Sequence, residues 1–461
     1  MPRADSADRA ADIARVLRQW KSGVPVPSSW APGVQAGVSR LRDWWHTPDP
    51  EVEAPEGSEQ ELALFLREAA VMLCRAGEPT TLVTALIEEI GHRYHAVDTR
   101  CFVLPTGVFI GIGEVVQFRS VQESQLRLDQ IDRLFRFLHQ VRAEPIPPEQ
   151  GLHELTLIAD APPRFGLLAR IAGYVAISVG LGLLSRPEPL TVIGYACLGF
   201  VVACLRELSA KLRGGSSSLL VPAIAAIVVT VLAFRYAGPI LNEEATTLLI
   251  PPLVAFLPGA ALTLGTMELA TGSVVAGASR LVYGTNVLVL IAFGVAVGTQ
   301  LATIHPVEHA GQHHPLGMWA TWVGVVLLAA GYSLFSSASK STLPWLIAVM
   351  CVAHGAQVAV TWWASPLFGA FAGGATLPLA ALLLARWRTA PSALVLFLPA
   401  FWVLVPGSLG LTGVSEILVS HDTAGIGALV DTVLTVAAIA LGVLATTSAV
   451  MPAYYRRSLH A

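Results

Sequence analysis

Residues 258–268 read PGAALTLGTME and residues 406–416 read PGSLGLTGVSE, so the pattern P-G-x5-G-x2-E occurs twice, 148 residues apart. Each copy lies within a long apolar stretch, where it places a helix-breaking proline and a carboxylate that a simple membrane anchor would lack. A motif that recurs at a fixed distance indicates an internal duplication. Interrupted apolar helices in both halves of a chain are typical of transporters.

The composition places the chain among membrane proteins. Of its 461 residues, 54% are hydrophobic and 13% are charged, whereas soluble domains have about 25% charged residues. The net charge of −3 gives no indication of a surface that binds nucleic acid. The five cysteines form no C-x-x-C pair and no disulfide pattern. The amino terminus lacks the apolar core of a secretory signal, so we expect no cleaved leader.

The region before the apolar stretches divides in two. Residues 1–57 are polar and rich in proline, which predicts a poorly ordered tail. Residues 58–163 combine helical periodicity, a strand-like segment with a turn at 105–107, and a further helix. Ser58 and Glu61 have the spacing of a capping box at the first helix. We therefore expect residues 58–163 to form a small cytoplasmic α+β domain.

Ten apolar stretches follow, each of about 20 residues and therefore long enough to span ~30 Å of hydrocarbon. They are 167–185, 190–208, 218–238, 246–272, 278–303, 316–337, 342–362, 366–384, 391–418 and 424–447. Advancing the first five by 148 residues places their starts at or near the starts of the last five. This predicts one membrane repeat of five helices over 164–303, an extracellular loop over 304–315, a second repeat over 316–450 and a cytoplasmic tail over 451–461.

The odd number of spans in each repeat determines the relation between the two halves. A five-span unit inserts the second time with the opposite orientation, so the halves are related by a pseudo-twofold axis in the membrane plane. The predicted fold is an α-helical polytopic membrane protein with ten transmembrane helices in two inverted five-helix repeats, preceded by the α+β domain. Two nearly equivalent packings of such halves provide alternating access.

The distribution of lysine and arginine predicts the orientation in the lipid bilayer. With the region before residue 164 on the inside, the inside connections and the carboxyl-terminal tail carry nine basic residues, whereas the outside connections carry two, Arg186 and Arg235. The nine are Arg206, Lys211, Arg213, Arg280, Lys340, Arg386, Arg388, Arg456 and Arg457. Both termini are therefore expected in the cytoplasm, in a multi-pass protein of the plasma membrane.

Three stretches carry a resemblance to a known family. They are AGEPTTLVTALIEEI with FVLPTGVFIGI, the junction GLHELTLIADAPPRFGLLARIAGYVAISVGLGLL, and LPGAALTLGTMELATGSVVAGASRLVYG with its echo VPGSLGLTGVSEIL. The chain resembles the threonine/serine exporter family of bacteria and fungi over roughly residues 60–450. Members often have Arg and Glu after the AG-x-P-T element, where this chain has Leu82 and Thr84, so no role is transferred to these two positions.

The resemblance implies a secondary carrier that exports small amino acids, with threonine and serine as substrates and protons as the coupling ion. Related systems split into two polypeptides are associated with dicarboxylate export, so a succinate-like substrate remains the alternative. A channel of the same architecture is a second alternative. The oligomeric state stays open, a homo-oligomer included.

The paired motif predicts a substrate site. A helix broken at proline exposes free carbonyl groups on one side of the break and free N–H groups on the other, and a zwitterion needs both. The alternative interpretation is that the glycines and prolines only permit close packing of the helices. The candidate substrate-binding residues are Pro258, Gly259, Thr263, Gly265, Thr266, Pro406, Gly407, Ser408, Thr412 and Gly413.

Three carboxylates within the apolar stretches are candidates for proton coupling, because an intramembrane acid costs at least ~2.5–3.5 kcal/mol and is functional by default. Asp431 is the leading candidate, with a structural hydrogen-bonding role as the alternative. It has no acidic counterpart in the first half, where Tyr283 corresponds. Glu268 and Glu416 follow their prolines by ten residues, and their depth in the membrane depends on whether these helices re-enter.

No other class of function finds support in the residues. The 58–163 region contains histidines and scattered acids without a catalytic motif or a phosphate-binding loop, so we expect neither an enzyme nor a bound cofactor. The segment IHPVEHAGQHHP contains four histidines, but its proline and glycine residues oppose the helix that would direct the rings to one metal ion. A regulatory or assembly role for the α+β domain remains open.

Overall fold

The computed structural model describes residues 58–121, 125–185, 187–211, 220–302, 316–387, 389–404 and 424–458. The predicted tail (1–57), the predicted loop (304–315) and the second copy of the motif (406–416) lie outside the described residues.

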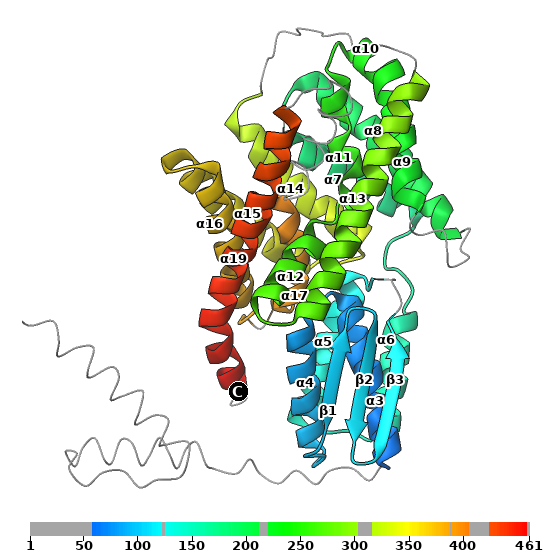
Figure 1. The fold of residues 1–461 in the computed structure, drawn as a ribbon, viewed down its shortest axis with the longest axis vertical. Helices are drawn as coiled ribbons and strands as arrows, with labels where there is room; N and C mark the ends of the chain where they lie inside the picture. The colour runs from blue at the N-terminus through cyan, green and yellow to red at the C-terminus, as the bar shows by residue number, and fades with distance from the viewer. Residues whose placement is uncertain are drawn as a thin grey trace, which may run out of the picture. The chain divides into compact units, whose positions relative to one another are not determined.

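The first described part of the chain combines helices with a small antiparallel sheet (Figure 1). The sheet has the order β1-β2-β3, from β1 (Arg100–Leu104), β2 (Gly107–Ile112) and β3 (Val115–Ser120). The helices are α3 (Glu59–Ala76), α4 (Thr80–Arg93), α5 (Leu128–Ala143) and α6 (Pro148–Asp160). Ser58 begins α3 with the expected capping box, in which its hydroxyl accepts from the Glu61 N–H at 3.2 Å.

Alternation along the strands explains how this sheet packs. Val108, Ile110 and Ile112 are buried, whereas Phe109 between them is exposed. The buried side chains join one apolar core with those of α3, including the fully buried Phe65 and Leu66. The residues from 58 to 160, which we call the N-region, thus combine four helices with a three-stranded sheet, and α6 is a helix that the sequence analysis did not include.

The apolar part is helical throughout the described residues. Its first half contains α7 (Leu167–Ser185), α8 (Pro189–Lys211), α9 (Leu220–Leu232), η1 (Ala233–Ala237), α10 (Gly238–Leu241), η2 (Ala245–Leu248), α11 (Ile250–Leu253), η3 (Val254–Phe256), α12 (Gly259–Ala270) and α13 (Val274–Ala302). Its second half contains α14 (Met318–Phe335), α15 (Thr342–Trp363), α16 (Pro366–Leu384), α17 (Ala393–Ala400), η4 (Phe401–Leu404) and α19 (Ala424–Ser458).

Within the described ranges, eight helices are long and apolar enough to cross a membrane, or nine if one bent pair counts as a single span. The bent pair consists of 245–256 and 259–270, which meet at an angle of 60°. Pro258 lies at the break, as its missing N–H and its ring predict. The remaining expected span begins with the shorter apolar helix Ala393–Leu404 and continues into residues that the structure does not describe.

The two halves contact each other through α7 and α14. A Cβ atom added to Gly173 would lie 2.7 Å from the Gly331 carbonyl oxygen, and one added to Gly180 would lie 2.7 Å from the Gly324 carbonyl oxygen. The later residue of α7 thus faces the earlier residue of α14, so the two helices run in opposite directions. Only glycine allows backbones to approach this closely.

Within each half, the third and fifth apolar helices also pack through a glycine. A Cβ added to Gly294 on α13 would lie 2.6 Å from the Ala223 carbonyl oxygen on α9. A Cβ added to Gly442 on α19 would meet the Phe371 carbonyl oxygen on α16. Phe371 and Gly442 follow Ala223 and Gly294 by 148 residues, the same distance that separates the two motifs.

Candidate functional site

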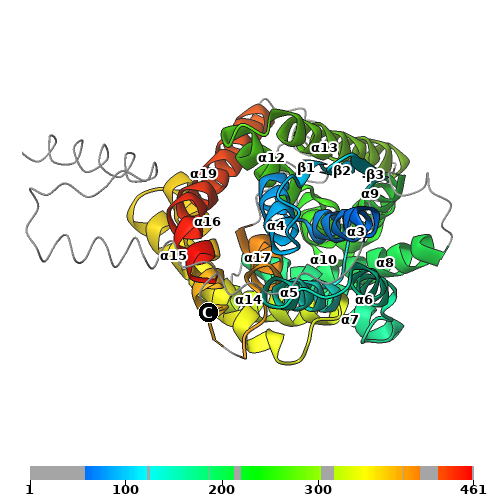
Figure 2. The ribbon, with the colours of Figure 1, turned by 90° about the horizontal axis from the view of Figure 1, so that it is seen from below.

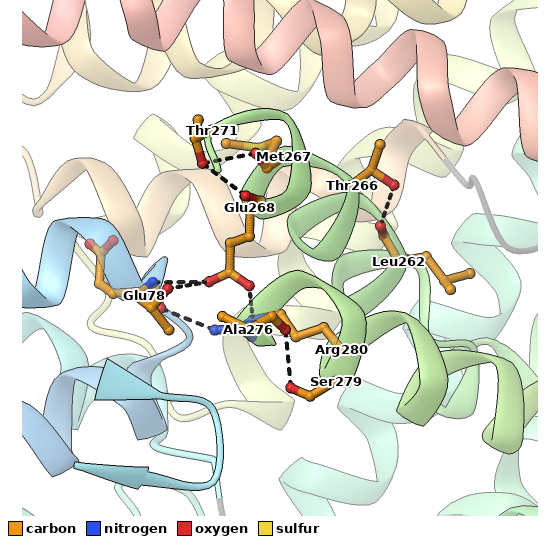
Figure 3. A network of polar contacts seen from close by, with 10 residues as sticks. Glu78, Leu262, Thr266, Met267, Glu268, Thr271, Ala276, Ser279 and Arg280 are labelled. Carbon is orange, nitrogen blue, oxygen red and sulfur yellow. Dashed lines mark hydrogen bonds and ion pairs between the residues drawn. The ribbon is translucent and has the colours of Figure 1, made fainter. Parts of the chain in front are cut away.

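The carboxylate of Glu268 is the centre of a buried polar cluster (Figure 3). The side chain is 1% exposed and accepts three hydrogen bonds. The Thr80 N–H and the Thr80 hydroxyl each donate at 3.0 Å, and Arg280 Nε donates at 2.9 Å. Arg280 Nη2 also donates to the Glu78 carbonyl oxygen at 3.2 Å. We call Glu78, Thr80, Glu268 and Arg280 the Glu268 cluster.

The local sequence brings Glu268 and Arg280 together across a tight helical hairpin. The α12 helix ends at a turn in which Gly272 has φ +87°, a left-handed conformation that favours glycine. Gly265 and Gly277 then let α12 and α13 approach closely, since a Cβ on Gly277 would lie 2.6 Å from the Gly265 carbonyl oxygen. Residues 12 positions apart in the sequence thereby face each other.

The N-region contributes the start of α4. The residue before this helix is Pro79, which has no side-chain group to cap the first N–H groups. The Glu268 carboxylate accepts from the Thr80 N–H instead and so caps α4 at the positive end of the helix dipole, although Glu268 lies 188 positions away in the sequence. Burial of the carboxylate is therefore balanced by a guanidinium and two neutral donors, as a buried charge requires.

A cavity of about 550 Å³ lies beside the cluster, between α4, α12, α16, α17 and α19. Figure 2 shows α4 next to α12 and α17. Its walls are mostly apolar, with Leu264, Phe397 and Leu444 among them, so we call it the apolar cavity. Its acidic residues are Glu78, Glu89 and Glu268.

Two titratable groups of the N-region, Glu78 in the cluster and Cys74 near it, have pKa values above their ordinary ones. Burial raises the pKa of Glu78 to about 7, although the neighbouring Arg280 guanidinium acts in the opposite direction. Burial also raises the pKa of the Cys74 thiol to about 12, so this thiol stays protonated near neutral pH. The Glu78 carboxyl, in contrast, exchanges protons in the physiological range.

The predicted substrate residues of the first motif surround the helix break but do not line the apolar cavity. Pro258 precedes α12 and Gly259 is its first residue. The Thr263 side chain is 1% exposed, and its hydroxyl has no hydrogen-bond partner in the described part of the chain. The Thr266 hydroxyl donates to the Leu262 carbonyl oxygen at 2.8 Å. Gly265 has the packing role against α13 that the alternative interpretation gave it.

The second copy of the motif cannot be placed, because Pro406, Gly407, Ser408, Thr412, Gly413 and Glu416 lie outside the described residues. Asp431 lies on α19 with an exposed side chain, between the exposed Val430 and Val433. It is therefore not covered by other described residues, and it does not line the apolar cavity.

The contribution of the N-region to the site is what sequence reasoning missed. Thr80 is not among the sequence candidates, and Arg280 is named there only among the basic residues that predict the orientation in the bilayer. A signal was present in the segment TMELATGSVVAGASR, where one acid and one base flank a T-G-S turn between two apolar helices. No group of three potential metal ligands occurs among the described residues, and the four histidines of the predicted loop lie outside them.

A match to a protein-family model identifies the family of this chain. A family model described as "Putative threonine/serine exporter" matches residues 64–302. The chain belongs to this exporter family. The matched residues run from α3 to α13 and include the whole Glu268 cluster. Together with the apolar helices, membership in this family indicates a multi-pass membrane protein.

One curated relative is a fungal membrane protein. The chain is 28% identical over 186 residues to "Pheromone-regulated membrane protein 10" of Eremothecium gossypii, which covers 37% of this chain and 24% of the relative. The chain thus spans about a quarter of that relative's length. No solved structure matches the chain.

Proposed function

We propose that the protein is a secondary exporter of small amino acids, with threonine and serine as its substrates, and that it exchanges them for protons across the plasma membrane. The N-region lies on the cytoplasmic side in this proposal. The observation that carries it is the apolar cavity with a carboxylate cluster at its wall, beside a membrane helix that is broken at Pro258. Irregular backbone at membrane depth is tolerated where it is buried in protein or lines a water-filled cavity.

Alternating access requires two halves that can exchange conformations, and the helix packing supports such a duplication. Gly294 and Gly442 make equivalent backbone contacts in the two halves. The α7–α14 contact is antiparallel and pairs Gly173 with Gly331 and Gly180 with Gly324. A twofold axis perpendicular to both helices produces this pattern. We therefore retain the proposal of two inverted five-helix repeats, 164–303 and 316–450.

The charges at the apolar cavity favour an amino acid over a dicarboxylate. Three of its lining residues are acidic, and Glu268 and Glu89 already have arginine partners at 2.9 and 2.6 Å. The third, Glu78, has no such partner among the described residues, so in its ionised form it attracts an ammonium group and repels a dianion such as succinate. The helix break, where Gly259 begins α12 and the Thr263 hydroxyl has no hydrogen-bond partner among the described residues, lies outside the lining of this cavity. In this proposal it forms a second polar position along the pathway.

The remaining predicted residues complete the proposal. The second motif, with Pro406, Gly407, Ser408, Thr412 and Gly413, supplies the other half of the substrate site. Asp431 takes up protons on the outer side, while Glu268 and Glu416 control the two ends of the pathway. The exposed position of Asp431 on α19 supports access from outside the helix bundle.

Counterflow in proteoliposomes tests the function and separates a carrier from a channel. Vesicles are preloaded with threonine, serine, alanine or succinate, and labelled threonine is added outside. We expect transient accumulation with threonine and serine and none with succinate. A channel would equilibrate the label without accumulation. Folded protein that gives no accumulation with any of the four compounds would contradict the proposed substrate class.

A further inference from the structure

Glu78 lies where two cavities meet. Besides the apolar cavity, the structure contains a cavity of about 770 Å³ between α5 and the adjoining ends of α15, α16 and α17. Its wall includes Arg136, Arg142 and Ser341, so we call it the polar cavity. Four residues line both cavities, namely Glu78, Leu382, Ala393 and Leu394. The other three residues at this junction are apolar.

The backbone of Glu78 is held in place, while its carboxyl group is not engaged. The carbonyl oxygen accepts the hydrogen bond from Arg280 at 3.2 Å. Within the part of the chain that the structure describes, the carboxyl group accepts no hydrogen bond and has no ion-pair partner. Figure 3 shows it turned away from Glu268 and Arg280. The group is therefore positioned by its own main chain and free to bind a ligand.

Most charged groups around Glu78 are paired with one another. The ion pairs are Glu268–Arg280 on α12 and α13, Glu89–Arg142 on α4 and α5, and Asp132–Arg136 on α5. His139 and Arg164 line the polar cavity, where they are exposed to water. Cys74 on α3 is a neutral thiol near pH 7 because burial raises its pKa to about 12. Burial raises the pKa of Glu78 to about 7, so this acid changes charge near neutral pH.

We propose that Glu78 is the inner exchange site of the exporter, where the carboxyl group releases one proton as it binds the ammonium group of the outgoing amino acid. This inference rests on the proposed function. In the exchange, the O–H bond of the Glu78 carboxyl breaks and the proton passes to water in the polar cavity. The resulting carboxylate then accepts an N–H hydrogen bond from the substrate.

Loss of the proton leaves one negative charge on Glu78, which the positive charge of the substrate ammonium balances, so the carboxylate of the substrate is the one charge that the exchange adds. Either a neutral carboxylic acid or a carboxylate–ammonium pair faces the apolar cavity, and an unpaired charge there would be costly. Proton and substrate compete for one group, so the two cannot be carried in the same direction on it. Glu78 thereby makes this step an antiport.

The first test is the pH dependence of the KM for exchange from the N-region side. For the wild type, competition by one proton raises the KM about tenfold for each unit of pH below the pKa of Glu78. In Glu78→Gln, we expect a KM about tenfold above that of the wild type at pH 8, and no change between pH 5.5 and 8. Glu114→Gln, at an exposed acid beside the β2–β3 turn, is the matched control and keeps the wild-type profile.

The second test needs no transport. Threonine is added to purified wild type in a weakly buffered solution at pH 7, and proton release is measured with an indicator dye. The wild type and Glu114→Gln release protons on binding, Glu78→Gln releases none, and Glu78→Asp restores release. Release by monodisperse Glu78→Gln equal to that of the wild type overturns the assignment of Glu78 while the exporter proposal stands. A wild type that neither binds nor exchanges any of the amino acids overturns both.

Discussion

The two halves of the membrane part share a packing framework but differ in their charges. Gly294 and Gly442 make the same contact with the carbonyl oxygens of Ala223 and Phe371. By contrast, Arg280 of the first half corresponds to Ala428 of the second, so Glu416 has no arginine 12 residues later. Close helix packing restricts the size of the residue at both Gly294 and Gly442. The charged residues are not restricted in this way and differ between the two halves.

The difference is greatest where the N-region binds. Glu268 has an arginine partner and also caps the α4 helix of the N-region. The second half has no arginine at the position of Arg280, but it has an acid, Asp431, at the position of Tyr283. We infer that the first half forms the end of the pathway that the N-region covers.

Replacement of Arg280 is expected to have the largest effect. Arg280→Met leaves the Glu268 carboxylate buried without a cation, and breaking a buried pair in this way costs about 3–5 kcal/mol. We expect the free energy of unfolding in lipid nanodiscs to fall by this amount and counterflow to be lost.

The matched variant in the second half is Ala428→Met, which introduces the same side chain without removing a charge, so it lacks the loss that comes from an unpaired carboxylate. The double variant Glu268→Gln/Arg280→Met recovers much of the lost stability, because no unpaired charge remains. Equal losses for Arg280→Met and Ala428→Met would show that the two halves do not differ in this respect.

The shared framework predicts equal effects at its two equivalent glycines. Gly294→Leu and Gly442→Leu each force a side chain against a backbone carbonyl, and overpacking of this kind costs about 1–3 kcal/mol. We expect losses near the upper end at both positions, measured as unfolding in nanodiscs. Gly427→Ala on α19 is the control, since an added Cβ there meets nothing within 4 Å. A large loss at one glycine alone would contradict the duplication.

The contact between the N-region and the first half is tested at Thr80. Thr80→Val removes the hydroxyl that donates to Glu268 and keeps the N–H group. A hydrogen bond to a charged group contributes about 1.5 kcal/mol or more, so we expect a loss of that size. Thr80→Ser restores it. Thr81→Val, at the neighbouring exposed threonine, measures the change in stability that a threonine-to-valine replacement causes without this hydrogen bond. Equal losses of stability for Thr81→Val and Thr80→Val would show that the Thr80–Glu268 hydrogen bond does not stabilise the protein.

Asp431→Asn should have the smallest effect on stability, because the side chain is exposed on α19. The unfolding temperature should therefore match that of the wild type. Proton-driven efflux should be abolished while substrate exchange partly remains, because the variant cannot take up protons at this position. A wild-type pH dependence of efflux in Asp431→Asn would remove Asp431 from the coupling mechanism.

Local sequence signals predicted the helices well and the site only in part. The expected spans 167–185 and 366–384 coincide with α7 and α16, because the length of an apolar run and its flanking prolines and charges are local properties. The break at Pro258 is local for the same reason. The Thr80–Glu268 contact joins residues 188 positions apart, so no helical or strand period reports it. The exposure of Asp431 likewise depends on which face of α19 its neighbours cover.

The most direct test of the account asks whether the apolar cavity is the substrate pathway. Thr447 on α19 lines this cavity, and Thr447→Cys in a background without the five native cysteines places one reactive thiol there. We expect a charged methanethiosulfonate reagent to modify this thiol and block counterflow, with threonine but not succinate slowing the modification. Modification at a rate that threonine does not change, with counterflow intact, would contradict the assignment of this cavity as the pathway.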